Sequence, residues 1–146
     1  MIEYLVILGQ ELLLLDFQDA RMGPRQYDLV SLLKDSYVVL KEKTRNELLG
    51  YYLQCMEKEE DRPIPSAHFM KIFDWMSVQR NLKAIGTFSF QYMEHKNERY
   101  LEFLEPTLQY VINTIQSRPD LKPLGRVLKQ VIPELNRDNA GKASRL

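Results

Sequence analysis

Two short apolar runs open the chain, and each has the length of a β-strand. They cover residues 4–8 and 12–15, with Gly9-Gln10 between them. Glycine at the first central position of a two-residue loop suits a type II′ turn, so the pattern predicts an antiparallel hairpin over residues 4–15. The second run has no polar alternation, which is typical of a strand that is covered on both faces.

A polar, turn-prone segment covers residues 16–26, and Gly23-Pro24 is its strongest turn signal. Beyond it, the apolar positions take the three- and four-residue spacing of a helix. The first helical stripe consists of Leu29, Leu32, Leu33, Tyr37 and Leu40. Thr44, followed three residues later by Glu47, is a capping-box pattern and predicts a helix from there to about Glu60.

The stretch from Ser66 to about Met93 is apolar on nearly every face. A helix of this kind is usually the central one of its domain, and Ser66 is placed to cap its start. Gly86 is expected to bend or divide this helix, because glycine is a poor helix former.

A further apolar stripe at helical spacing covers residues 101–115, and Pro106 interrupts it. Proline is favoured at the first position of a helix, so we expect two helices here, the second starting at Pro106. A last short helix is predicted after Pro119, ending near Ile132, with a polar tail at 136–146. The whole pattern predicts a mainly α fold of six or seven helices with one N-terminal β-hairpin.

The composition narrows the class of protein. The chain has 146 residues, enough for one hydrophobic core, and its 20 basic side chains balance 20 acidic ones. That balance argues against a dedicated nucleic-acid binder. No apolar run reaches the roughly 18 residues of a membrane helix, so we expect a soluble, cytoplasmic chain that binds neither nucleic acid nor membrane. The single Cys55 is expected to be a small buried hydrophobe.

One carboxylate stands out as a candidate for chemistry. Asp16 follows directly after the second apolar run, so a rigid strand would place it while its side chain reaches a cleft. In phosphoryl transfer, an Asp in this position holds Mg²⁺ against the nucleotide phosphates. The simpler interpretation of an Asp after a strand is a turn or a helix cap. The two histidines, His68 and His95, lie far apart and are expected to serve packing or surface roles.

The residues around Asp16 carry a recognisable order of motifs. Leu15-Asp16-Phe17 is followed by Gly23-Pro24 and then by Tyr27-Asp28-Leu29-Val30. This pattern resembles the aminoglycoside phosphotransferase family of small-molecule kinases, whose fold is similar to that of protein kinases. The resemblance implies that Asp16 is the metal-binding Asp of the kinase Asp-Phe-Gly motif, with Mg²⁺ and ATP as cofactors of the intact family. It also implies that Asp28 supports the catalytic loop by hydrogen bonds.

A second segment narrows the resemblance. Residues 73–88, FDWMSVQRNLKAIGTF, are similar to a helix of bacterial amino-sugar kinases, which phosphorylate the anomeric hydroxyl of N-acetylmuramic acid and N-acetylglucosamine. The similarity extends over most of residues 12–110. By this resemblance the candidate substrate-binding residues are Asp74, Gln79 and Arg80, whereas the apolar side chains of the segment, Trp75, Met76 and Phe88, are expected to belong to the core.

The resemblance also shows which parts of such a kinase this sequence does not contain. The family has a nucleotide-binding N-terminal lobe and a catalytic loop, His-Xaa-Asp-Xaa-Xaa-Xaa-Xaa-Asn, before the hairpin. We therefore expect residues 1–135 to be the C-terminal lobe of a kinase, from a truncated reading frame, a split gene or a deliberately shortened protein. We expect it to be inactive alone, to bind ATP and Mg²⁺ weakly and to self-associate through the bared lobe interface. The alternative is a non-catalytic helical binding module derived from that lobe.

Overall fold

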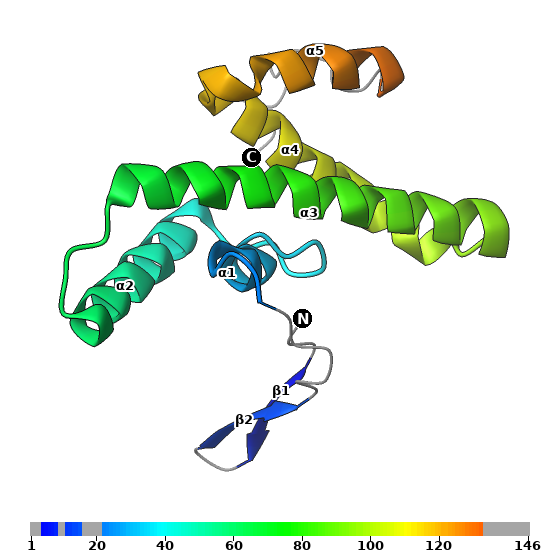
Figure 1. The fold of residues 1–146 in the computed structure, drawn as a ribbon. Helices are drawn as coiled ribbons and strands as arrows, with labels where there is room; N and C mark the ends of the chain where they lie inside the picture. Colours follow the sequence, from blue (N-terminus) through cyan, green and yellow to red (C-terminus); the bar gives the residue numbers. More distant parts are fainter. Residues whose placement is uncertain (1–3, 9–10, 16–21, 133–146) are drawn as a thin grey trace.

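The computed structural model describes the backbone of residues 4–8 and 11–15 and all atoms of residues 22–132 (Figure 1). The described elements are β1 (Tyr4–Leu8), β2 (Glu11–Leu15), α1 (Gln26–Leu33), α2 (Glu42–Glu60), α3 (Ser66–His95), the 3-10 helix η1 (Glu98–Phe103), α4 (Leu104–Ser117), the 3-10 turn η2 (Pro119–Leu121) and α5 (Lys122–Val131). The mainly α fold is confirmed.

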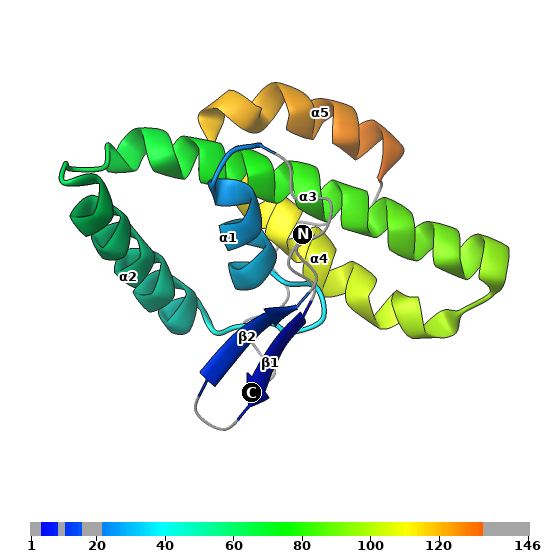
Figure 2. The same ribbon diagram turned by 60° about the horizontal axis from the view of Figure 1, so that its bottom comes forward.

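The two strands pair antiparallel in the predicted hairpin, with Tyr4 opposite Leu15 and Leu8 opposite Glu11. Within the described part of the chain this sheet has two strands, so each strand has one edge without a partner strand. The hairpin stands apart from the helices in both views (Figures 1 and 2). The turn at residues 9–10 and the side chains of β2 lie outside the described atoms, so the turn type and the two-sided burial stay predictions.

Helix α3 is the centre of the helical part, as its all-round apolar sequence predicts. It packs against α1, and separately against α4 and η1. One cluster of buried apolar side chains fills each of these two interfaces. The first contains Leu29, Val30, Leu33, Phe69 and Phe73, and the second contains Val78, Leu108, Val111, Leu121 and Leu128. Both clusters therefore contain residues of α3. Helix α5 packs against α4 and contributes Leu128 to the second cluster.

Several predicted helix boundaries are wrong. Helix α2 begins at Glu42 after an uncapped Lys41, so Thr44 does not open a capping box. Ser66 is already the first residue of α3, and Pro65 precedes it without a side-chain cap. Pro106 is the third residue of α4. The first four N–H groups of a helix have no acceptor within the helix, so the proline there breaks no intrahelical hydrogen bond. Each of these sequence signals lies within three residues of the boundary that the structure shows.

The first stripe of apolar residues extends beyond the end of the helix that it predicts. Helix α1 ends at Leu33, and the Asp35 carboxylate then accepts a hydrogen bond from the Tyr37 backbone N–H at 2.6 Å, which is typical of a turn. The Tyr37 ring nevertheless packs edge-on against Phe103, with centroids 4.6 Å apart, and against Phe88. An apolar residue therefore reaches the molecule's second interface from a loop rather than from a helix.

Three further expectations concern single residues. Gly86 does not divide α3, which runs unbroken from Ser66 to His95. Cys55 is exposed rather than buried, because α2 contributes no fully buried residue to the fold. Among the expected core residues Phe88 is buried and Met76 packs against the first core cluster, but Trp75 is 45% exposed. None of the described helices is both long and apolar enough to span a bilayer.

Candidate functional site

The predicted site residues lie in different surroundings. Asp16 falls outside the described residues. Asp28 is the third residue of α1, and its side chain is exposed and forms no hydrogen bond or ion pair with the described part of the chain. A carboxylate in the first turn of a helix is favoured by the helix dipole whether or not it has a partner. Asp28 is therefore free to accept hydrogen bonds from another segment.

Asp74 lies in a chain of alternating charges that runs from the interior to the surface. Its carboxylate is 3.9 Å from Lys34 Nζ and 3.8 Å from Arg118 Nε, and Arg118 in turn is 3.2 Å from Asp120. We call Lys34, Asp74, Arg118 and Asp120 the Asp74 network. Burial raises the pKa of Asp74, and the neighbouring Lys34 and Arg118 oppose that shift. The carboxylate is thus held by two cations in a partly dry environment.

Lys34 forms the buried end of this network and joins three helices. It lies directly after α1, its side chain is 15% exposed, and its Nζ donates hydrogen bonds to Ser77 Oγ at 3.0 Å and Thr114 Oγ1 at 3.2 Å. The same ammonium lies 5.2 Å from the centroid of the Phe73 ring. Burial lowers the pKa of Lys34 to about 8, against the opposing pull of Asp74. Sequence reasoning missed this residue, whose one signal was a lysine next to the apolar Leu32 and Leu33.

A polar pocket of about 340 Å³ opens beside Lys34 and Asp74. Four helices contribute to it, and it combines an apolar floor with groups that can donate or accept hydrogen bonds. Its lining consists of Leu33, Lys34, Glu42, Arg45, Asn46, Leu49, Met70, Phe73, Asp74 and Ser117. The volume lies at the small end of the range for small-molecule sites. An apolar floor beside carboxylate, amide, hydroxyl and ammonium groups can bind a polyhydroxylated ring of the size of one sugar.

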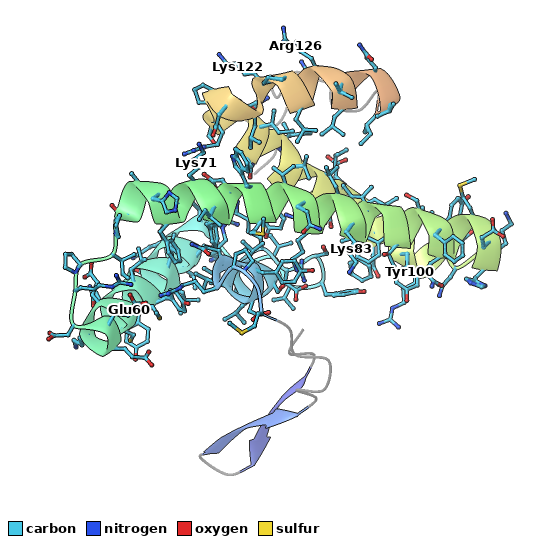
Figure 3. The ribbon with its side chains drawn as sticks, in the orientation of Figure 1. Glu60, Lys71, Lys83, Tyr100, Lys122 and Arg126 are labelled. Carbon is cyan, nitrogen blue, oxygen red and sulfur yellow. The ribbon has the colours of Figure 1, made fainter. Side chains whose placement is uncertain are left out.

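The outer end of the Asp74 network surrounds the exposed Trp75. The indole N–H donates to Asp120 Oδ2 at 3.2 Å, and Lys71 Nζ lies 5.2 Å from the ring centroid. Figure 3 shows Lys71 on the face of α3 that points toward α5, away from α1. Phe73, two residues before Trp75, packs in the α1 interface, and a step of two residues turns a helix by about 200°. Trp75 therefore lies on the face of α3 that is turned away from Phe73 and α1, where it contacts Lys71 and Asp120 and stays 45% exposed.

The structure does not bring the three candidate sugar-binding residues together. Asp74 lines the polar pocket, whereas Gln79 is exposed elsewhere on α3. Arg80 points toward α1, where its Nε donates to Ser31 Oγ at 2.6 Å, and its Nη1 is buried without a partner among the described residues. Ser31 itself donates to the Tyr27 carbonyl, which fixes it to α1. Arg80 thus connects α3 to the helix that carries Asp28.

Within residues 22–132, no group of three or more His, Cys, Asp or Glu side chains is arranged to hold a metal ion. Mg²⁺ prefers several oxygen ligands in octahedral geometry and usually keeps some of its water. A lone carboxylate such as Asp28 does not provide that set.

The comparisons with known proteins agree on one kind of relative. Proteins named N-acetylmuramate/N-acetylglucosamine kinase match the chain at 34% identity in three bacteria: Neisseria meningitidis serogroup B over 120 residues, Pseudomonas aeruginosa over 116 and Pseudomonas putida over 119. The matches cover 81%, 78% and 80% of this chain. The chain is similar to amino-sugar kinases. No family model matches it.

This similarity confirms the predicted resemblance to amino-sugar kinases, while membership of the broader aminoglycoside phosphotransferase family stays an expectation. The matched stretch is 36%, 34% and 35% of the three relatives, so the chain spans about a third of their length.

Proposed function

We propose that this chain is the C-terminal part of an ATP-dependent kinase that phosphorylates N-acetylmuramate or N-acetylglucosamine, and that it is inactive alone. The observation that carries the proposal is the 34% identity, over about four-fifths of the chain, to three kinases of that one name. An ATP-dependent reaction would place the protein in the cytoplasm. The order of the motifs around Asp16 and Asp28 supports a position next to the phosphoryl-transfer centre.

In this proposal Asp16 holds Mg²⁺, which neutralises charge on the nucleotide phosphates when it is bound. Asp28 accepts hydrogen bonds from the catalytic loop, a role that its exposed and unpaired carboxylate at the start of α1 supports. Arg80 is a positioning residue rather than a sugar contact, because its hydrogen bond to Ser31 ties α3 to α1. The phosphoryl-transfer step then needs a base and phosphate-binding groups that this chain does not supply.

The sugar contact is assigned to Asp74, and Gln79 is retained as a contact that would require a ligand extending along α3. Asp74 lines the polar pocket of about 340 Å³, which supports this role. Lys34 and Arg118 favour the ionised form of Asp74 against the effect of burial on its pKa, and an ionised carboxylate accepts short hydrogen bonds from hydroxyl groups. The apolar floor beside it suits the non-polar face of a pyranose ring or an N-acetyl methyl group.

A chimera tests the proposal. Residues of this chain replace the matched stretch of the meningococcal kinase, and ATP-dependent phosphorylation of N-acetylmuramate and N-acetylglucosamine is measured by ADP release. We expect an active chimera, and a loss of about a hundredfold or more in kcat for Asp16→Asn, since a misplaced metal removes electrostatic stabilisation of the transition state. The exposed Glu102→Gln serves as the matched control and should leave kcat unchanged.

The chain by itself, assayed in parallel, should transfer no phosphate. A folded chimera without kinase activity would contradict the proposed function, and so would an Asp16→Asn chimera that keeps full activity. Phosphorylation of either sugar by the 146-residue chain alone would contradict the proposal that this chain is inactive by itself.

A further inference from the structure

A second pocket lies between α4 and α5 and has a different character from the polar pocket at Asp74. It encloses about 670 Å³, and its walls are mainly apolar, with Ile112 and Ile115 on α4 and Gly125 on α5. We call it the α4–α5 groove. Its volume falls within the range of small-molecule sites, and such sites are mostly apolar with a few polar groups that orient the ligand.

The groove and the polar pocket at Asp74 share no described lining residue. Helix α5 lies on one side of α3 in both views, and α1 and the hairpin lie on the other (Figures 1 and 2). Asp28 is on α1, and Asp16 follows the hairpin strand β2 in the chain. Because the two linings are separate, a ligand in the groove would leave the described residues of the polar pocket free for a sugar.

The charged side chains along the groove all have one sign. Lys122, Arg126 and Lys129 line it, and none of its lining residues within the described part of the chain is acidic. The described charged residues of the groove are thus all basic, although the formal net charge of the whole chain is zero. Lys122 and Arg126 lie one helical turn apart, so their side chains are neighbours on the helix surface. Neither of them forms an ion pair with the described residues, and Figure 3 shows both projecting from α5 away from α3.

The floor of the groove depends on a glycine. A Cβ atom at Gly125 would lie 2.7 Å from Ile115 Cγ2, closer than side-chain atoms can approach. Gly125 therefore allows the backbone of α5 to contact α4 directly at this point. This close contact brings α5 against α4 at one point. Beside that point Ile112 and Ile115 expose apolar surface to the groove.

We propose that the α4–α5 groove binds a single-chain anionic amphiphile, with the acyl chain on Ile112 and Ile115 and the carboxylate or phosphate head between Lys122 and Arg126. The ten residues of α5 rise about 15 Å, which matches an extended acyl chain of medium length better than a partner helix of several turns. A head group between two cations forms charge-assisted hydrogen bonds, which are stronger than those between neutral groups.

Titration calorimetry with dodecanoate tests this proposal on the full chain, kept below the micelle concentration. 1-Dodecanol offers the same apolar chain without the charge and should bind about tenfold more weakly or worse. The double variant Lys122→Gln, Arg126→Gln should raise the Kd of dodecanoate by about tenfold and bring it close to that of dodecanol. Lys83→Gln, an exposed lysine of α3 outside the groove (Figure 3), is the matched control and should leave the Kd unchanged.

A second variant addresses the apolar wall. Ile112→Glu places a carboxylate beside the acyl chain at a half-buried position and should abolish dodecanoate binding while far-ultraviolet circular dichroism stays unchanged. Equal affinity for dodecanol and dodecanoate, or an unchanged Kd in the lysine–arginine double variant, would overturn the proposal. Tight binding of an acidic amphipathic peptide without any binding of dodecanoate would overturn it as well. None of these outcomes depends on the kinase activity of the chimera, so the two proposals fail separately.

Discussion

Lys34 offers the sharpest test of how the helices are held together. Its ammonium group is mostly buried among α1, α3 and α4, and burial lowers its pKa from 10.5 to about 8. In the unfolded chain the same lysine is hydrated and keeps its proton up to its ordinary pKa. Between these two values the unfolded state binds more protons than the folded state does. The free energy of unfolding must therefore rise with pH across this window.

The size of the effect follows from the two pKa values. A separation of about two and a half pKa units corresponds to about 3 kcal/mol in total. Integration from about pH 7 to about pH 9.5 gives an increase of about 2 kcal/mol in the free energy of unfolding. This range stops below the titration of the tyrosines Tyr37 and Tyr52, whose pKa values burial raises and whose effect on stability has the opposite sign.

Urea denaturation followed by circular dichroism at several pH values measures this slope. In Lys34→Met the slope should vanish, because the titrating group is gone while most of its volume remains. Ser77 keeps a contact with Asn81, Thr114 still donates to the Tyr110 carbonyl, and Asp74 keeps Arg118. We therefore expect the stability at pH 7 to stay within about 1 kcal/mol of the original, as is common when a buried ion is replaced by an apolar residue.

The matched control is Lys83→Met, which changes an exposed lysine and should keep the slope. A slope that persists in Lys34→Met would refute the assignment to Lys34. A loss of more than about 3 kcal/mol at pH 7 in that variant would show that the ammonium stabilises the fold rather than opposing it.

Three shorter predictions concern the glycines and the hairpin. Gly125→Ala should lower the free energy of unfolding by about 1–3 kcal/mol, since its Cβ would collide with Ile115, and a urea melt measures this. Gly86→Ala should raise it by about 0.5–1 kcal/mol in the same assay, because nothing lies within 4 Å of its Cβ; a loss there would contradict the open surroundings. The chain should self-associate through the unpaired strand edges of residues 4–15, and light scattering that finds a stable 17.3 kDa monomer at micromolar concentration would rule this out.

Helix existence and order could be predicted because those signals are local. The three- and four-residue spacing of apolar positions marks each helix, and the short apolar runs around Gly9-Gln10 mark the hairpin. The central place of α3 also followed from its own sequence, since a helix that is apolar on most faces has to be covered on most faces. The resemblance to amino-sugar kinases, read from short motifs, was confirmed by the relatives over about four-fifths of the chain.

The candidate site could be predicted only in part. Asp74 was named from the resemblance and does line a pocket, but Gln79 and Arg80 lie on other faces of the same helix. The reason is geometric: residues five or six positions apart on a helix share no face unless a ligand extends along it. Lys34 has only a weak local signal, its position next to Leu32 and Leu33, because its hydrogen-bond partners Ser77 and Thr114 come from helices distant in the sequence.

The sequence by itself determined which segments become helices and strands, because hydrogen bonds between near neighbours and the period of the apolar positions are written into consecutive residues. Only the tertiary structure decided where those elements end and which polar groups they enclose. The start of α2 at Glu42 and the solvent exposure of Trp75 depend on what each segment packs against. The α4–α5 groove likewise exists because Gly125 and Ile115, ten residues apart in the chain, meet in space. Contacts of this kind depend on the path of the whole chain, which no local pattern specifies.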